Sequence, residues 1–249
     1  MLSLLLILCA GLWAGTQNAL AGGGSFITLP TLILSGLDPR AANITSTIAL
    51  FPAQVTTGWL GRQGATGAAG LSLRALVLLS LVGGALGALL LLLTPPSFFA
   101  RLVPWLVLFA TGVFAWGSFL RKPQAEGAKP HLGKRGAAVA QFLIAIYGGY
   151  FGGGIGFLMM AALAFAGLQA KASAATKNVL AGVMNASAVL IFCFSGQVGW
   201  AKGAVLCIGA LVGGVIGAWA LKRVNEKALR VVVVLIGIAL TVGLFVRGA

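Results

Sequence analysis

Acidic residues are almost missing from this sequence of 249 residues. Asp38, Glu126 and Glu226 are the only three, against 17 Lys and Arg. Charged residues of either sign make up 8% of the chain, whereas a water-soluble domain has about a quarter of its residues charged. Because 59% of the residues are hydrophobic, the sequence predicts an integral membrane protein whose surface faces lipid.

Motifs for metal binding and catalysis are missing as well. Cys9, Cys193 and Cys207 each stand alone in an apolar stretch, and His131 is the only histidine. Without a CxxC pair or a Cys/His cluster, neither a metal site nor a disulfide framework is predicted. The sequence also lacks a nucleophile–base pair and a phosphate-binding loop, so we expect neither an enzyme nor a cofactor.

The excess of positive charge, formally +14, does not form a nucleic-acid-binding patch. Lys and Arg lie in the short gaps between apolar runs, which is where charges orient a membrane protein. We therefore expect the lipid bilayer and a small solute as partners, and no nucleic acid. Whether copies of the chain form a homo-oligomer is left open.

Apolar runs cover most of the chain, and two of them are unusually short. A helix needs about 20 residues to cross a bilayer core of about 30 Å. The runs 25–35 and 155–168 are shorter, and each follows a glycine triplet, at 22–24 and 152–154. The one long polar gap, 121–136, is interpreted as a basic linker.

The two triplets lie 130 residues apart (22 to 152), and other motifs recur at nearly the same interval. LVGGALGA at 81–88 matches LVGGVIGA at 211–218 at six of eight positions. Near the triplets one residue is gained, so that Thr45 pairs with Thr176. This shared register predicts an internal repeat. The units are a first transmembrane repeat at 1–120, the linker at 121–136 and a second transmembrane repeat at 137–249.

The distribution of Lys and Arg favours one of two topologies. If each triplet only bends a continuous crossing, the repeats are parallel and the basic residues divide nine against eight. If the chain reverses at each triplet, the repeats are inverted and the division is thirteen against four, with only Arg40, Arg101, Lys202 and Arg247 on the poorer side. Only the second division satisfies the positive-inside rule. Five full crossings per repeat would give the same parity.

We therefore predict an all-α integral membrane protein of two tandem inverted-topology repeats. Each repeat has a glycine-interrupted helix or a re-entrant hairpin, plus three transmembrane helices. The linker is expected in the cytoplasm and both termini outside. Inverted repeats with interrupted helices are typical of secondary transporters, whose substrate site lies between the repeats near the midplane.

The glycine triplets are the first candidates for the site. Non-helical backbone at membrane depth must line water or be buried in protein, and a helix that starts there has unpaired N–H groups that attract anions. With inverted repeats, both helix starts are expected to face one cavity and bind the anion. The other interpretation is close helix packing, which we favour for Gly83-xxx-Gly87 and Gly209-xxx-Gly213-xxx-Gly217 because these lie inside full-length runs.

Polar residues near the triplets complete the predicted site. Lys177 lies several residues inside an apolar run, where it either serves function or extends to the membrane surface. No acid is available nearby, so a small anion is the expected substrate, and its export could run on the membrane potential alone. Tyr147 and Tyr150 flank the second triplet as structural motif residues. The predicted substrate-binding residues are Gln17, Asn18, Gly22, Gly23, Gly24, Ser25, Thr45, Ser46, Gly152, Gly153, Gly154, Thr176, Lys177 and Asn178.

Residues 21–50, AGGGSFITLPTLILSGLDPRAANITSTIAL, resemble the first signature of the sulfite exporter TauE/SafE family. Residues 147–180 resemble its second copy. The resemblance implies a bacterial inner-membrane permease for sulfite, organosulfonates or related sulfur-containing anions, most often an exporter. Pro30 carries over as a motif residue, whereas Met160 stands where a second proline is expected, so the second hairpin is expected to differ in shape.

The sequence thus predicts a permease that exports a small sulfur-containing anion. Two alternatives remain: an ion-coupled importer of similar anions, and a membrane scaffold that transports nothing. Flux of sulfite or a sulfonate in proteoliposomes separates the three.

Overall fold

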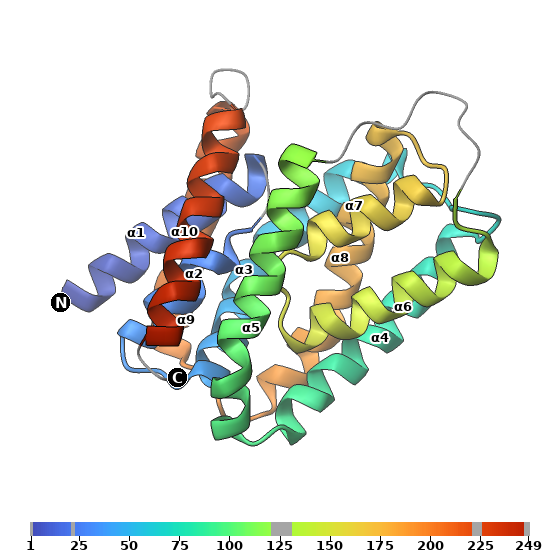
Figure 1. The fold of residues 1–249 in the computed structure, drawn as a ribbon. Coiled ribbons are helices and arrows are strands. Elements are labelled where there is room, and N and C mark those ends of the chain that lie inside the picture. Colours follow the sequence, from blue (N-terminus) through green and yellow to red (C-terminus); the bar gives the residue numbers. More distant parts are fainter. Residues whose placement is uncertain (1, 21–22, 121–130, 221–225, 247–249) are drawn as a thin grey trace.

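The computed structural model describes residues 2–20, 23–120, 131–220 and 226–246, and within these ranges the fold is helical (Figure 1). A 3₁₀ turn at Arg62–Gly64 and a π-helical turn at Trp116–Leu120 extend α3 and α5. The α-helices are α1 (Leu2–Leu20), α2 (Ser25–Leu34), α3 (Pro39–Gly61), α4 (Leu73–Leu93), α5 (Pro96–Ala115), α6 (Lys134–Tyr150), α7 (Ile155–Phe165), α8 (Ala170–Cys193), α9 (Trp200–Ala220) and α10 (Glu226–Val246).

Several of these helices are suited to a bilayer. Four described stretches are long and apolar enough to cross it, namely Leu73–Leu93, Pro96–Phe119, Ala170–Cys193 and Trp200–Gly217. Shorter apolar helices accompany them. Large apolar side chains such as Leu93, Trp105 and Phe194 are exposed on the outside of the bundle. The chain is therefore a multi-pass membrane protein.

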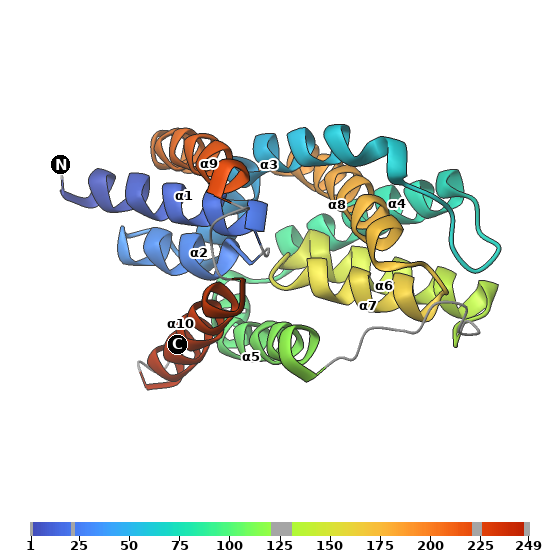
Figure 2. The same ribbon diagram turned by 90° about the horizontal axis from the view of Figure 1, so that it is seen from above.

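Both glycine triplets interrupt a helix. The first separates α1 from α2, and the second separates α6 from α7. Gly23, Gly152 and Gly154 have φ angles of 85°, 80° and 73°, a region that residues with a Cβ rarely adopt. After each break the chain turns back, so that α2 runs beside α1 and α7 beside α6 in opposite directions (Figures 1 and 2).

The two short helices also end in the same way. Gly36 and Gly167 follow α2 and α7 with φ angles of 95° and 91°. In both cases the residue after the glycine donates its N–H to a carbonyl five residues earlier, Leu37 to Leu32 and Leu168 to Leu163. This is the Schellman ending that glycine permits.

Helices from the two halves of the chain pack in reciprocal pairs. α1 of the first half lies along α9 of the second, and α6 of the second lies along α4 of the first. Glycines allow both close approaches: a Cβ on Gly213 would collide with the Leu12 carbonyl, and one on Gly87 with the Ile146 carbonyl. The packing role predicted for Gly83, Gly87, Gly209 and Gly213 is therefore confirmed. α3 packs against α8 in the middle, and α5 against α10.

The connections between helices form two groups, one at each end of the bundle, and hydrogen bonds show which connections lie together. We call these ends the linker face and the opposite face. The linker face has the connections 62–72 and 166–169, with Thr66 bonded to Thr176 and the His131 N–H bonded to the Phe165 carbonyl. The opposite face has the connections 35–38, 94–95 and 194–199. There Lys202 Nζ donates to the Ser35 carbonyl at 2.6 Å.

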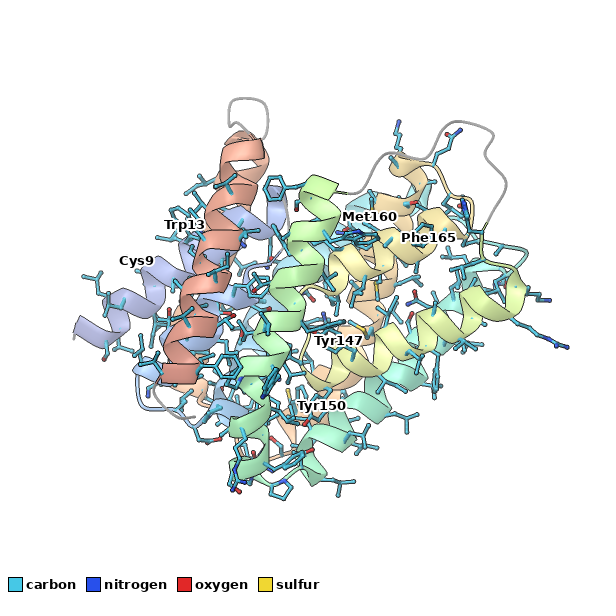
Figure 3. All side chains as sticks on the ribbon, in the orientation of Figure 1. Cys9, Trp13, Tyr147, Tyr150, Met160 and Phe165 are labelled. Carbon is cyan, nitrogen blue, oxygen red and sulfur yellow. The ribbon has the colours of Figure 1, made fainter. Side chains whose placement is uncertain are left out.

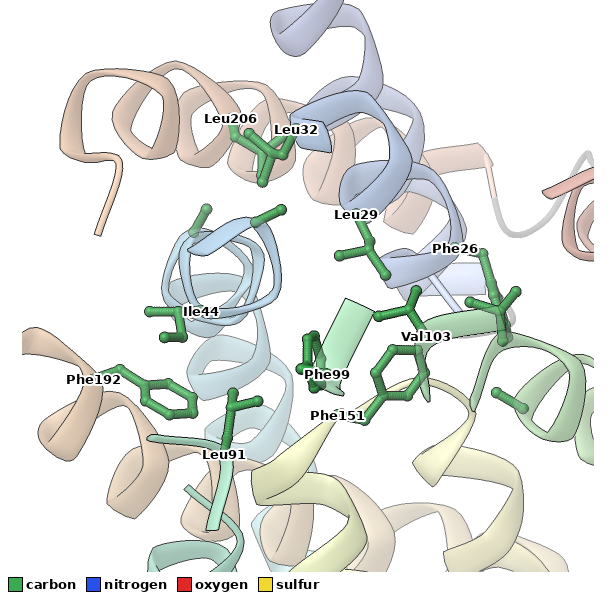
Figure 4. Close-up of a cluster of buried hydrophobic side chains, with 14 of the residues drawn as sticks. Phe26, Leu29, Leu32, Ile44, Leu91, Phe99, Val103, Phe151, Phe192 and Leu206 are labelled. Carbon is green, nitrogen blue, oxygen red and sulfur yellow. The ribbon is translucent and has the colours of Figure 1, made fainter. Parts of the chain in front are cut away.

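The largest apolar core contains side chains from both halves of the chain. Phe26, Ile44, Phe99, Phe151 and Phe192 belong to it, and they come from α2, α3, α5, the second glycine break and α8 (Figure 4). All five are less than 5% exposed. The core therefore fixes the first turn of α2 and the second break in place.

Candidate functional site

A cavity of about 710 Å³ lies between the two glycine breaks. Its size falls in the range of about 300–1,000 Å³ that is typical of small-molecule sites. The parts of α1, α3, α8 and α9 that line it are those nearer the linker face. The lining residues are Gly15, Asn18, Gly23, Ser25, Ala53, Gln54, Thr56, Gly152, Gly154, Ile155, Gly156, Phe157, Lys177, Asn178, Ala181, Leu211, Val212, Gly214 and Val215.

Asn18 caps the helix start at the first break. Its Oδ1 accepts the Gly24 N–H at 2.7 Å, so one of the unpaired donors at the start of α2 is already satisfied. A Cβ on Gly24 would lie 2.7 Å from Asn18 Nδ2 and 2.8 Å from the Ala14 carbonyl oxygen, so only glycine fits there. Gly23 and Ser25 face the cavity, whereas Gly22 lies outside the described residues.

The helix start at the second break is open. Gly154 precedes α7 without a side-chain cap, and its carbonyl accepts from Phe157 at 3.1 Å. The N–H groups of Ile155 and Gly156 have no acceptor in the described part of the chain, and both residues line the cavity. Gly148 occupies the position 130 residues after Asn18, so the second half has no equivalent cap.

Lys177 lies beside this open helix start. A Cβ on Gly156 would lie 3.6 Å from Lys177 Cδ and 4.0 Å from its Nζ. The ammonium group and the α7 start both carry positive charge, so an anion between them is attracted by both. The described residues that line the cavity include no acid, and the carboxylate of Asp38 caps α3 at the opposite face.

Two cavity residues were missed by the sequence analysis. Gln54 accepts a short hydrogen bond from Asn185 Nδ2, and Thr56 donates to the Pro52 carbonyl at 3.0 Å. Gln54 and Asn185 lie 131 residues apart, the same interval that pairs Thr45 with Thr176. That interval was the signal that could have identified Gln54.

The apolar wall of α9 was also missed. Leu211, Val212 and Val215 line the cavity from this helix. The cavity therefore combines a polar end, at Lys177 and the start of α7, with an apolar side.

Four of the predicted site residues point away from the cavity into protein. Thr45 accepts the Gly199 N–H at 3.0 Å, and the hydroxyls of Ser46 and Thr28 lie 2.6 Å apart. Thr176 Oγ1 accepts the Thr66 N–H at 2.9 Å and donates to the Thr66 carbonyl at 3.2 Å. Gln17 is buried and accepts from Trp13 Nε1 at 3.1 Å. The hydroxyls of Thr45, Ser46 and Thr176 bond to other helices or connections, whereas the bond from Trp13 to Gln17 lies within α1.

The second break is held by the tyrosines of α6. Tyr147 donates its hydroxyl to the Gly153 carbonyl at 2.8 Å, and the Tyr150 carbonyl accepts from Asn43 Nδ2 at 3.1 Å. Both rings pack edge-on against α5, Tyr147 on Phe109 and Tyr150 on Phe99 (Figure 3). These contacts fix the backbone that leads into α7.

Pro30 and Met160 differ in their surroundings. Pro30 lies inside α2 and faces a small apolar gap lined by Phe26, Ile33 and Leu244. α7 continues through Met160 without a proline (Figure 3). The two short helices therefore differ internally although they end alike.

Long apolar helices, together with broken helices that open into a cavity, are the architecture of a multi-pass membrane transporter. Among the described residues, no three His, Cys, Asp or Glu side chains come together as a metal site. The family model "Sulfite exporter TauE/SafE" matches residues 7–244, and the chain belongs to this family.

Curated relatives carry transporter names. The "Probable membrane transporter protein" of Haemophilus influenzae is 29% identical over 244 residues, which covers 96% of this chain and 92% of the relative. "Probable membrane transporter protein ORF9" of Sinorhizobium sp is 29% identical over 93% of this chain and 88% of its own length. "Probable membrane transporter protein YfcA" of Escherichia coli (strain K12) is 25% identical over 90% and 82%. No solved structure matches the chain significantly.

Proposed function

We propose that the protein is a permease that exports sulfite, an organosulfonate or a related small sulfur-containing anion across the bacterial inner membrane. The observation that carries this proposal is the cavity in which Lys177 lies beside the open start of α7, with no acid among the lining residues that the structure describes. The family to which the chain belongs supports transport of a sulfur-containing anion.

The anion binds between Lys177 and the N–H groups of Ile155 and Gly156. Each charge-assisted hydrogen bond contributes about 1.5–3 kcal/mol, and the dipole of α7 adds attraction of the same sign. Asn178 and Ser25 line the same cavity and supply further polar contacts. The apolar wall of α9 gives space to the organic part of a sulfonate.

One helix start, rather than two, forms the anion site in this proposal. The sequence analysis expected the starts of α2 and α7 to act alike. Asn18 already occupies the Gly24 N–H at the start of α2, whereas α7 has no such cap. The first break then contributes side chains to the cavity wall, and the second break contributes backbone donors.

The proposed membrane topology is a pair of inverted repeats, 1–120 and 137–249, joined by the linker. Support comes from the reciprocal pairing of α1 with α9 and α6 with α4. The equivalent helices α5 and α10 lie side by side and run in opposite directions (Figure 1). With the linker face in the cytoplasm and both termini in the periplasm, the cavity receives its substrate from the cytoplasm.

The membrane potential supplies the driving force for export. The free energy of an anion that leaves a negatively charged cytoplasm falls by about 2.3 kcal/mol per charge for each 100 mV. Uptake against this potential would require a coupled ion. The described lining offers no carboxylate for a proton relay.

The experiment is flux of radiolabelled sulfite and methanesulfonate in proteoliposomes that contain the purified full-length chain. Flux that follows an imposed membrane potential without added Na⁺ or a pH gradient supports the exporter. Flux that requires either ion gradient indicates the importer instead. If the protein inserts correctly but carries no anion, the proposed transport is wrong and the scaffold is the remaining alternative.

A further inference from the structure

Side-chain amides form much of the neutral polar lining of the cavity. Asn18, Gln54 and Asn178 face it from α1, α3 and α8. An amide accepts through its oxygen and donates through its NH₂ group, so its orientation decides whether it favours an anion or a cation. For Asn18 and Gln54 the structure defines this orientation.

The orientation of Asn18 follows from a backbone group. Its Oδ1 accepts the Gly24 N–H, and a backbone N–H can only donate. Gly24 itself is not part of the cavity lining. The oxygen of Asn18 therefore bonds to a residue outside the cavity lining, and the NH₂ group is the other end of the amide.

Gln54 repeats this arrangement on α3. Its Oε1 accepts from Asn185 Nδ2, and Asn185 is only 3% exposed and does not line the cavity. The acceptor of Gln54 is thus also occupied from outside the cavity. Because an amide nitrogen carries two hydrogens, the NH₂ group retains donor capacity even where it makes a second contact.

We propose that Asn18 and Gln54 are charge-selectivity residues that present N–H donors to the transported anion, and that Asn185 is the positioning residue for Gln54. This inference rests on the proposed anion transport. Small cations need oxygen ligands, whereas both amide oxygens are directed toward protein donors outside the cavity lining. The amides therefore exclude cations as well as bind anions, and they extend the selectivity of Lys177 to two further walls of the cavity.

Replacing each amide by the matching acid tests the proposal without removing the protein contact. In Asn18→Asp the carboxylate still accepts the Gly24 N–H, because Asp caps a helix as well as Asn does. Only the NH₂ group is exchanged for a negatively charged oxygen. Gln54→Glu likewise retains the bond from Asn185. The matched control is Gln169→Glu, an exposed amide at the start of α8 outside the cavity.

The expected result is a fall in sulfite and methanesulfonate flux of about tenfold or more for Asn18→Asp and for Gln54→Glu, the size of one lost charge-assisted hydrogen bond. The loss should appear in KM, and flux of Gln169→Glu should equal that of the wild type. Asn18→Ala removes both the cap and the donor without adding charge. We expect Asn18→Asp to transport less than Asn18→Ala.

The opposite order would overturn the inference. If Asn18→Asp retains wild-type KM while Asn18→Ala is impaired, Asn18 is a helix cap and nothing more. If Gln54→Glu also transports normally, the cavity amides do not select charge, although anion transport itself stands. A wild-type protein that carries no anion would overturn the proposed function, and this inference with it.

Discussion

Thr45 and Thr176 make equivalent hydrogen bonds at opposite ends of the molecule. Thr45 Oγ1, in the first half of the chain, accepts the Gly199 N–H of the second half at 3.0 Å. Thr176 Oγ1, in the second half, accepts the Thr66 N–H of the first half at 2.9 Å. Each threonine thus bonds its own helix to a connection of the other half. Thr45 does so at the opposite face and Thr176 at the linker face.

The first prediction concerns the contribution of these two threonine hydroxyls to the stability of the protein. Both hydroxyls are buried, so replacement by valine leaves a backbone N–H without a partner, at a cost of about 1–3 kcal/mol. Thr176→Val should cost more than Thr45→Val because Thr176 also donates to the Thr66 carbonyl. Thermal unfolding in detergent measures both. Thr56→Val, at an exposed threonine bonded only within its helix, should change stability by less than about 0.5 kcal/mol.

The second prediction concerns the charge of Lys177. Lys177→Met removes the ammonium group from the α7 start, and we expect sulfite flux to fall about tenfold or more, because a charge-assisted contact is lost. Lys177→Arg should retain most of the flux. Lys171→Met, which removes an exposed lysine from the first turn of the same helix, should have no effect. Equal transport by Lys177→Met and wild type would instead assign Lys177 to the membrane surface.

The third prediction concerns the backbone of the second break. Gly154 has a φ of 73°, and a Cβ there would lie 3.2 Å from the Ala110 carbonyl oxygen. Gly154→Ala should therefore destabilise the protein by about 1–2 kcal/mol and reduce flux, because the start of α7 shifts. Gly112→Ala, at a helical glycine of α5 with open space around it, should leave flux unchanged and raise stability by about 0.5–1 kcal/mol. An unaffected Gly154→Ala variant would show that the break tolerates an ordinary backbone.

The fourth prediction concerns orientation in the membrane. In a background without Cys9, Cys193 and Cys207, single cysteines are placed at exposed positions. Gln63→Cys and Lys171→Cys should react with an impermeant maleimide only after the cell membrane is opened. Ser97→Cys, at the opposite face, should react in cells whose outer membrane alone is permeable. Reaction of Gln63→Cys and Ser97→Cys from the same side would exclude the proposed topology.

Much of the fold could be predicted because glycine leaves a clear local signal. Gly23, Gly152 and Gly154 of the triplets and the pair Gly36 and Gly167 adopt backbone conformations that other residues disfavour. The recurrence of these glycines at intervals of 130 and 131 residues predicted the repeat. The sequence analysis also selected Asn18, Lys177 and Asn178, which the structure brings together at one cavity. Their role in transport remains a prediction.

The four predicted residues that point away from the cavity could not be recognised from the sequence, because neighbouring positions on a helix face different directions. Thr176 and Lys177 are adjacent in sequence but about 100° apart around α8. One bonds to the connection at Thr66, and the other faces the cavity. Which direction meets a cavity depends on where α3, α7 and α9 pack, and nothing local in the sequence encodes that. The same reason explains why Gln54 was missed.

The glycine contacts between α1 and α9 and between α4 and α6 restrict how the molecule can move. Each contact brings two backbones together without intervening side chains, so we expect each helix pair to move as one rigid unit. Each pair takes one member from each half of the chain. A rocking motion that separated the first half from the second would have to break both sets of helix contacts. We therefore expect the rigid units of this fold to combine helices of both halves, so that their boundaries do not follow the boundary between the halves.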